Sequence, residues 1–483
     1  MLFNSLAFVV FFVAVFILYW SVFNRSAKLQ NILLLASSYL FYAFWDGRFL
    51  GLLILSSVLN YILGYYMGKT ARPKTKRMLL NIGIITSLGS LAYFKYANFF
   101  ITSFITLLAR FHVSADVHTL GIILPLGISF FTFRNLGYLF DINRGKIKPT
   151  TDGVAYLTFV AFFPCLISGP IDKAALLMPQ LEKKRKFSND EGTDGLRQIL
   201  WGLFKKTVIA DNCSSITNPI FDHYHSSPAS TLLIGAFLYT IQVYADFSGY
   251  SDMAIGIARL LGLNITRNFD FPFFAQNIAE FWRKWHISLT SWLTDYVFTP
   301  LSIAFRDYGK AGLIMAILIN FTLIGIWHGP NWTFVLFGFL HGCYYIPLIV
   351  RGTLNKRKKL QKGRLFPSFT EFRNITGTFI LVMLTFVIFR SDSIPQAFNV
   401  YKTILSKSLF YAPVFENNSL VVHTFIFILF FMAIEWVGKD GQYALAGVGA
   451  KWPSIIRWPF YYGLLTLIFL FAGSSQQFIY FQF

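Results

Sequence analysis

The chain has 483 residues, of which 55% are hydrophobic, 19% aromatic and 13% charged, and the charged share is about half that of a typical soluble domain. This composition excludes a disordered chain, which could not keep so much apolar surface hydrated, and a soluble globule, which needs more charge on its surface. The net charge of +20 lies in short basic runs between apolar segments, a pattern that disfavours nucleic-acid binding.

Apolar segments long enough to cross a membrane recur along the whole chain, and a transmembrane helix needs about 20 such residues. We expect an all-helical, polytopic membrane protein with one membrane-embedded domain over residues 1–483. Segments interrupted by glycine or proline are expected to be re-entrant or tilted, and the first is expected to be a helix rather than a signal peptide. The predicted segments are about 4–23, 31–45, 49–67, 78–94, 97–111, 119–140, 154–169, 229–245, 311–327, 333–350, 375–390, 421–437 and 457–473.

Basic loops predict the orientation of these helices. Arg25 and Lys28 lie between the first two segments, and a second basic cluster lies at 69–77. Because basic loops favour the cytoplasm, alternation places the N-terminus on the extracytoplasmic side. The later runs 183–186 and 356–364 are also expected to be cytoplasmic, either as topology signals that attract anionic lipid or as a docking site for an acidic partner.

Two polar features interrupt the apolar pattern. Residues Gly195–Cys213 show apolar side chains at helical spacing and predict an amphipathic helix lying along the membrane surface. Asp246 and Asp252 lie in apolar sequence but, six residues apart, share no helical face. Gly249 between them favours a broken turn, so hydrogen bonding to exposed backbone is expected, with a proton relay as the alternative.

His328 is the first candidate for chemistry. It lies in the sequence WHGPNW, between the apolar segments 311–327 and 333–350, where Gly329 and Pro330 predict a helix break. An ionisable group at membrane depth is a functional candidate, and imidazole suits proton transfer near neutral pH. The alternative is a neutral histidine that binds a carbonyl freed at the kink. With Lys310 at the cytoplasmic end, His328 would lie about 27 Å away, toward the far leaflet, or in mid-membrane if the hairpin is tilted.

His286 is the second candidate. Helical spacing places Trp282, Trp285 and His286 on one face, which predicts an interfacial helix that directs a histidine inward; an aromatic belt is the alternative. We expect His341 to have a helix-packing role. Trp282, Trp285 and Asn331 are the candidate substrate-binding residues.

No pattern predicts a metal or a bound cofactor. His223 and His225 have one residue between them but lack a set of nearby cysteine or carboxylate ligands. No glycine-rich phosphate loop is present. Cys165, Cys213 and Cys343 have no C-x-x-C spacing and do not predict a disulfide framework.

Long blocks of the sequence match one family. The most specific are Phe281–Leu289 and Trp327–Gly329, followed by Trp332, Gly338 and His341–Gly342. On these blocks the chain resembles the membrane-bound O-acyltransferases, most of all the bacterial branch that acetylates alginate and peptidoglycan. Further matching blocks are Ser129–Phe133, Phe162–Pro164, Ser168–Pro170, Tyr244–Asp252 and Phe478–Phe483.

The resemblance implies a fold of many helices with a thinned centre and a tunnel, in a bacterial inner membrane. It implies that His328 corresponds to the invariant family histidine and His286 to the second one. Such proteins move an acyl group from a cytoplasmic thioester, here acetyl-CoA, to a hydroxyl. In this branch the acetyl group is handed across the membrane to a periplasmic acetyltransferase, which completes transfer to a polysaccharide such as alginate.

The expected mechanism gives each histidine a role. His328 would be the general base for the acceptor hydroxyl or for a relay serine of a partner. His286 would position the donor or stabilise developing charge. The alternatives are D-alanyl transfer to teichoic acid, an export scaffold, and a polysaccharide transporter. A transporter would predict paired intramembrane charges and related halves, and the sequence shows neither.

Overall fold

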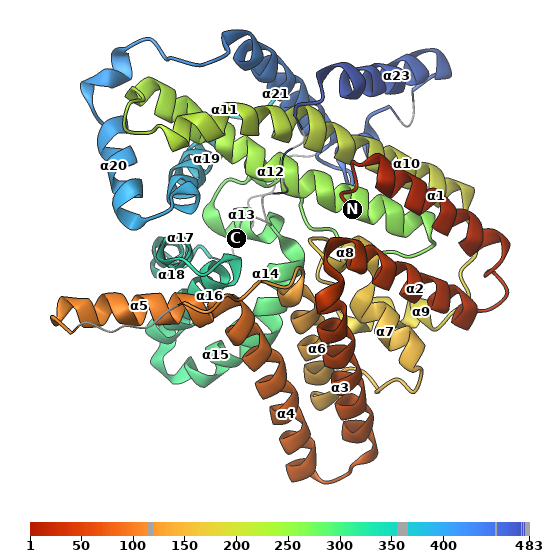
Figure 1. Ribbon diagram of the computed structural model, residues 1–483. Coiled ribbons are helices and arrows are strands. Elements are labelled where there is room, and N and C mark those ends of the chain that lie inside the picture. Colours follow the sequence, from red (N-terminus) through yellow and green to blue (C-terminus); the bar gives the residue numbers. More distant parts are fainter. Residues whose placement is uncertain (114–118, 355–365, 450–451, 475, 477, 479–483) are drawn as a thin grey trace. The chain divides into compact units, whose positions relative to one another are not determined.

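The computed structural model describes residues 1–113, 119–354, 366–449, 452–474, 476 and 478 (Figure 1). Within these residues every regular element is helical, which confirms the predicted all-helical fold. The basic run 356–364 and the last residues, 479–483, lie outside the described residues, so the predictions made for them are not addressed by the structure.

The chain divides into two compact units. The first comprises Met1–Gly192 with Ala258–Ile265, and the second comprises Thr193–Ile257 with Thr266–Phe483. The expectation of one domain over the whole chain stays a prediction. The helices of the first unit are α1 (Leu6–Ser21), α2 (Ala27–Asp46), α3 (Leu50–Lys69), α4 (Pro73–Leu91), α5 (Ala97–Arg110), α6 (Ile128–Asn143), α7 (Gly153–Ala161), α8 (Phe163–Leu166) and α9 (Ala174–Leu181).

The second unit contains every candidate site residue. Two long helices shared with the first unit, α10 (Asn189–Phe204) and α12 (Ala229–Leu260), contribute most of their length to it. Its other helices are α11 (Asp211–Asp222), α13 (Ile278–Lys284), α14 (Ile287–Leu293), α15 (Thr299–Ala304), α16 (Gly309–His328), α17 (Trp332–Cys343), α18 (Ile346–Val350), α19 (Phe369–Arg390), α20 (Ile394–Ile404), α21 (Asn418–Gly438), α22 (Ala444–Gly447) and α23 (Ser454–Phe471).

Eight helical stretches of the described chain are long and apolar enough to cross a membrane, so the protein is a multi-pass membrane protein. Two predicted segments differ in detail. The segment 119–140 becomes helical only at Ile128, after Gly127 with its φ of +71°. The segment 154–169 is split into α7 and α8 at Phe162, because Pro164 cannot continue the hydrogen bonding of the preceding helix. The candidate spans are Ala27–Lys69, Pro73–Arg110, Ala229–Leu260, Arg306–His328, Trp332–Val350, Phe369–Arg390, Asn418–Gly438 and Ser454–Phe471.

The predicted surface helix at Gly195–Cys213 is wrong, because this segment packs inside the second unit. Trp201 and Phe204 are fully buried, and a π-helical turn, η3 (Lys205–Ala210), joins α10 to α11 without leaving the interior. Glycine allows the close approach. A Cβ at Gly202 would lie 2.6 Å from the carbonyl oxygen of Gly249 on α12, so the two backbones are in contact.

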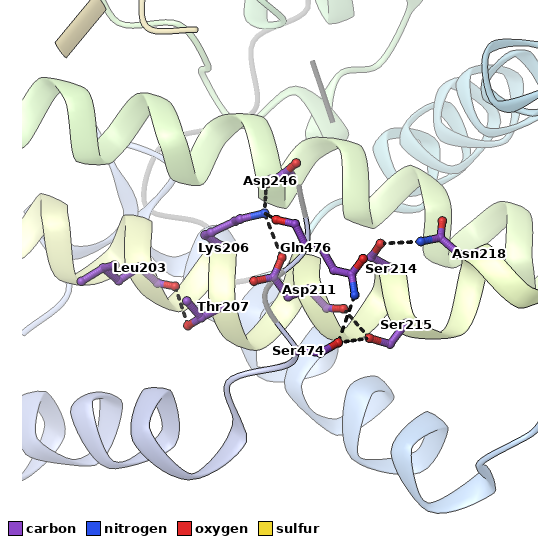
Figure 2. A network of polar contacts seen from close by, with 10 residues as sticks. All are labelled: Leu203, Lys206, Thr207, Asp211, Ser214, Ser215, Asn218, Asp246, Ser474 and Gln476. Carbon is purple, nitrogen blue, oxygen red and sulfur yellow. Dashed lines mark hydrogen bonds and ion pairs between the residues drawn. The ribbon is translucent and has the colours of Figure 1, made fainter. Parts of the chain in front are cut away.

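The prediction for Asp246 and Asp252 is also wrong, because α12 is continuous through both residues and both carboxylates form ion pairs. The Lys206 ammonium lies 2.8 Å from Asp246 and 2.8 Å from Asp211, as Figure 2 shows. Lys205 lies 2.5 Å from Asp252. These pairs make a candidate span carry paired charges that the sequence did not reveal, since the lysines lie on another helix.

The group formed by Lys206, Asp211 and Asp246, here called the Lys206 cluster, also includes residues near the C-terminal end of the described chain. The Lys206 ammonium donates to the carbonyl oxygen of Gln476 at 3.3 Å, and Ser474 and Ser215 share a hydrogen bond of 3.3 Å (Figure 2). Lys206 and Asp246 are both buried. One ammonium therefore serves two buried carboxylates and a backbone carbonyl.

Helices α16 and α17 form a tight antiparallel hairpin that carries His328 (Figure 1). At their contact, a Cβ at Gly338 would overlap the carbonyl oxygen of Phe321 and would lie 2.8 Å from the backbone nitrogen of Gly325. Only glycine at both positions lets the two backbones come this close.

Gly338→Ala is expected to lower the free energy of unfolding by about 1–3 kcal/mol, the usual cost of inserting a methyl group into a filled contact. Gly377→Ala is the matched control, because a Cβ at that position on α19 meets nothing within 4 Å. Thermal unfolding in detergent measures both variants. Equal stability of the two would contradict the close contact.

Candidate active site

His328 lies at the break between α16 and α17, as the sequence predicts. Helix α16 ends at His328, and Gly329 takes an extended conformation. Asn331 begins the next helix: its side-chain oxygen accepts from the Thr333 amide at 3.0 Å, and its side-chain nitrogen donates to the carbonyl of Asp392 at 2.9 Å. Asn331 thus has a local structural role, and its predicted contact with substrate stays a prediction.

His286 lies at a second break, between α13 and α14, so the single predicted helical face does not exist. Its φ of +45° is in the left-handed region, which is uncommon for residues other than glycine. Asn268 explains the break. Its carbonyl accepts from the Ile287 amide at 2.9 Å, and its side-chain oxygen accepts from the Ser288 amide at 3.2 Å, replacing bonds of a continuous helix. The strained backbone directs the imidazole into the interior.

The two breaks bring the two predicted catalytic histidines to the same place. The ring of Trp327 lies 5.3 Å from that of His286 and 5.1 Å from that of His328, measured between centroids. His286 is 0% exposed and His328 5% exposed. Burial lowers the pKa of His286 well below its ordinary value, and the nearby His328 lowers it further. His286 is therefore neutral at physiological pH.

Aromatic rings form the walls around these imidazoles. Phe247 meets His286 edge-on at 4.6 Å, and Phe389 meets His328 edge-on at 5.1 Å. Phe337 lies 6.0 Å from His328 and 5.0 Å from Phe389, so these two rings pack together beside the imidazole. Such an apolar environment keeps the effective dielectric low, so a charge that develops beside either imidazole interacts with it more strongly than in water.

The two predicted tryptophans differ in role. The indole nitrogen of Trp282 donates to Nδ1 of His341 at 3.1 Å, a bond that joins α13 to α17. Trp285 packs among other rings, with Phe281 stacked at 5.3 Å and Phe269 edge-on at 5.1 Å. Both indoles are buried, so their predicted role in binding substrate stays a prediction.

Sequence reasoning missed two features of this region. The ring of Trp327 is in contact with both histidines, although the residue was noted only as part of a motif. The bond from Trp282 to His341 was missed because the two lie 59 residues apart. A pair of buried polar groups on different segments has no signal in spacing.

Within the described residues, no group of three histidine, cysteine or acidic side chains is placed to hold a metal.

The neutrality of His286 can be measured directly. In protein with ¹⁵N-labelled histidine, the imidazole signal that disappears in His286→Asn should keep the shifts of a neutral ring at pH 5.5, because burial opposes protonation. Asparagine is the suitable replacement because it tolerates the left-handed backbone. Free histidine in the same buffer is the reference. A signal that titrates together with free histidine would contradict the buried, neutral assignment.

A helical, multi-pass membrane protein with two buried imidazoles beside one indole has the features expected of a membrane acyltransferase. Comparison with known proteins agrees: the family model described as MBOAT, membrane-bound O-acyltransferase family, matches residues 151–387. The chain belongs to the membrane-bound O-acyltransferase family and is an acyltransferase.

Individual relatives support the family assignment. The chain is 36% identical to the probable alginate O-acetylase AlgI of Azotobacter vinelandii over 84% of this chain and 78% of that protein. It is 32% identical to the peptidoglycan O-acetyltransferase of Helicobacter pylori over 100% of this chain and 98% of that protein. It is also 32% identical to the teichoic acid D-alanyltransferase of Streptococcus thermophilus, but over 55% of this chain and 68% of that protein.

Proposed function

We propose that this protein takes an acetyl group from a cytoplasmic thioester, acetyl-CoA, and passes it across the membrane for O-acetylation of an extracytoplasmic polysaccharide such as alginate. The observation that supports this most strongly is the pair of buried imidazoles, His286 and His328, which two helix breaks bring next to the same ring, that of Trp327. The relatives named as acetyltransferases match 84% or all of the chain, whereas the D-alanyltransferase matches 55%. This difference favours an acetyl donor.

In this proposal His328 is the general base. It removes the proton from the acceptor hydroxyl, or from the serine of a periplasmic acetyltransferase, as the oxygen attacks the thioester carbonyl. The C–S bond then breaks, and the leaving thiolate takes up the proton that His328 accepted, so that the free thiol is released and His328 is neutral again. General-base assistance contributes about 10²–10⁴-fold to the rate of such a step. His286 lies on the donor side and positions the thioester or stabilises the charge that develops on its carbonyl oxygen.

The hairpin gives the transfer a direction. The ammonium of Lys310, at the start of α16, donates to the carbonyl of Val350 at 3.2 Å, so the basic residues Lys310 and Arg351 lie at one end of the hairpin and His328 at the other. If the basic end faces the cytoplasm, as basic residues favour, His328 lies about 27 Å up the helix. By the same rule, the basic loops at 25–28 and 69–77 favour an extracytoplasmic N-terminus. The acceptor meets His328 from the far side, and the donor comes from the basic end.

Purified protein incubated with acetyl-CoA labelled in the acetyl group tests the proposal. The expected result is release of CoA together with label on a polysaccharide acceptor or on the periplasmic partner. Binding of acetyl-CoA without turnover would favour a transporter. Turnover of a D-alanyl carrier-protein thioester, with none of acetyl-CoA, would assign the chain to D-alanyl transfer instead.

A further inference from the structure

His341 is a buried histidine with one bonded and one unbonded nitrogen. It is 0% exposed, and its Nδ1 accepts the indole N–H of Trp282 at 3.1 Å. An indole nitrogen can only donate, so Nδ1 is the acceptor of this bond and the ring proton of the neutral imidazole is on Nε2. Trp282 therefore fixes the tautomer of His341.

The N–H at Nε2 of His341 has no hydrogen-bond acceptor in the described part of the chain. Its neighbours are aromatic rings: Phe337 at 4.6 Å, Trp282 at 5.1 Å and Tyr344 at 5.5 Å between centroids. The face of a ring is a weak acceptor and does not replace an oxygen. A buried donor without an acceptor is costly and uncommon in native proteins, so its presence calls for a reason.

The position of His341 suggests what the acceptor is. Because Gly338 on α17 packs against Gly325 on α16, His341 lies about six residues, or roughly 9 Å, along α17 from the level of His328, toward the basic end of the hairpin. Phe337 is a neighbour of both imidazoles, with its ring 4.6 Å from that of His341 and 6.0 Å from that of His328. His341 is therefore too far from His328 to act on the same carbonyl. It lies instead at the level that a donor must pass to reach His328 from the basic end.

We propose that Nε2–H of His341 donates a hydrogen bond to an amide carbonyl of the pantetheine arm of the acyl donor. Thioesters of coenzyme A and of carrier proteins share this arm, whose amide groups follow the sulfur and trail behind the thioester as it reaches the site. The inference rests on the proposed function, since it takes the donor to be such a thioester. His341 then binds the pantetheine arm of the acyl donor and does not contact its acyl group.

Two replacements separate the two nitrogens of His341. His341→Asn keeps an oxygen near the position of Nδ1, so Trp282 retains its acceptor, but removes the distal N–H. His341→Gln extends a side-chain N–H to about the position of Nε2. His423→Asn, on an exposed face of α21, is the matched control for placing asparagine at a helical histidine.

The experiment compares two acetyl donors with these variants. S-acetylpantetheine carries the amide groups, and S-butyl thioacetate has none. We expect His341→Asn to raise the KM for S-acetylpantetheine about tenfold to one hundredfold, the range for a buried acceptor that loses its donor, with kcat within about threefold. The KM for S-butyl thioacetate should change less than about twofold, and His341→Gln should recover part of the loss.

Two results would overturn the inference: an unchanged KM for S-acetylpantetheine in His341→Asn, or equal losses with both thioesters, which would mean a structural role only. Failure of the proposed function looks different, because the wild-type protein would then turn over neither thioester. In that case, calorimetric binding of pantetheine itself still decides. His341→Asn should bind it more weakly than wild type and His423→Asn, and equal affinity would refute the role of His341.

Discussion

Replacing His328 by alanine should lower the rate of acetyl transfer by about 10²–10⁴-fold, because the general base is lost. The protein should remain folded, because the packing of its helices is retained. His328 is the last residue of α16, so the substitution does not interrupt the hydrogen bonding along the interior of that helix. The measurement is transfer of labelled acetyl groups from acetyl-CoA by purified protein, at matched amounts of folded protein. Because the rings around His328 are apolar, a water molecule that replaces the lost imidazole would be a poor base.

His423→Ala is the control, since this imidazole is exposed on α21 and should leave the rate unchanged. His286→Asn should lower the rate as well, but by a smaller factor, because in the proposed mechanism it assists the donor and does not accept the hydroxyl proton. Near-normal transfer by His328→Ala would refute the assignment of the base. It would support a scaffold that assembles an export complex, whose activity depends on its interfaces instead.

Replacing Lys206 by methionine should lower the free energy of unfolding by about 3–5 kcal/mol, the usual cost of breaking a buried ion pair from one side. The substitution leaves Asp211 and Asp246 as two buried carboxylates without their shared ammonium. Unfolding by SDS in mixed micelles measures the change. The triple variant with Asp211→Asn and Asp246→Asn should recover much of the stability, because no buried charge is then left unpaired.

The loss should also depend on pH. Burial raises the pKa of Asp211 to about 7, against the opposing effect of Lys206. The folded protein therefore binds this proton more tightly than the unfolded chain, and the stability that protonation contributes is lost as the pH rises through the folded pKa. Lys206→Met should accordingly be least destabilised near pH 5 and most destabilised near pH 8. Lys407→Met, at an exposed position, should change stability by less than about 0.5 kcal/mol at either pH. Wild-type stability of Lys206→Met would contradict the ion-pair assignment.

What could be predicted from the sequence was local. The break at His328 follows from Gly329 and Pro330, its immediate neighbours, and the structure has it. The break at His286 could not be predicted, because its cause is Asn268, which binds the Ile287 and Ser288 amides from outside the helix. Periodicity alone therefore gave one helix where the structure has two.

The paired charges show the same limit. Lys206 lies in a segment whose pattern is typical of a surface helix, and its partner Asp246 lies in an apolar span. Each residue alone looks out of place, and only their 2.8 Å contact explains both. Two unexplained opposite charges in apolar sequence are a usable signal for such a pair, but the sequence does not say which lysine meets which aspartate.

The glycine contact between α16 and α17 has a mechanical consequence. The backbones of the two helices are in contact at Gly325 and Gly338 and cannot slide past each other without collision. We therefore expect the hairpin to move as one rigid body. His328 and His341 both belong to this rigid hairpin and should therefore keep a constant distance from each other throughout a turnover. If the site opens to admit substrate, the movement must occur where other helices contact this hairpin. A cross-link between α16 and α17 should therefore leave turnover unchanged.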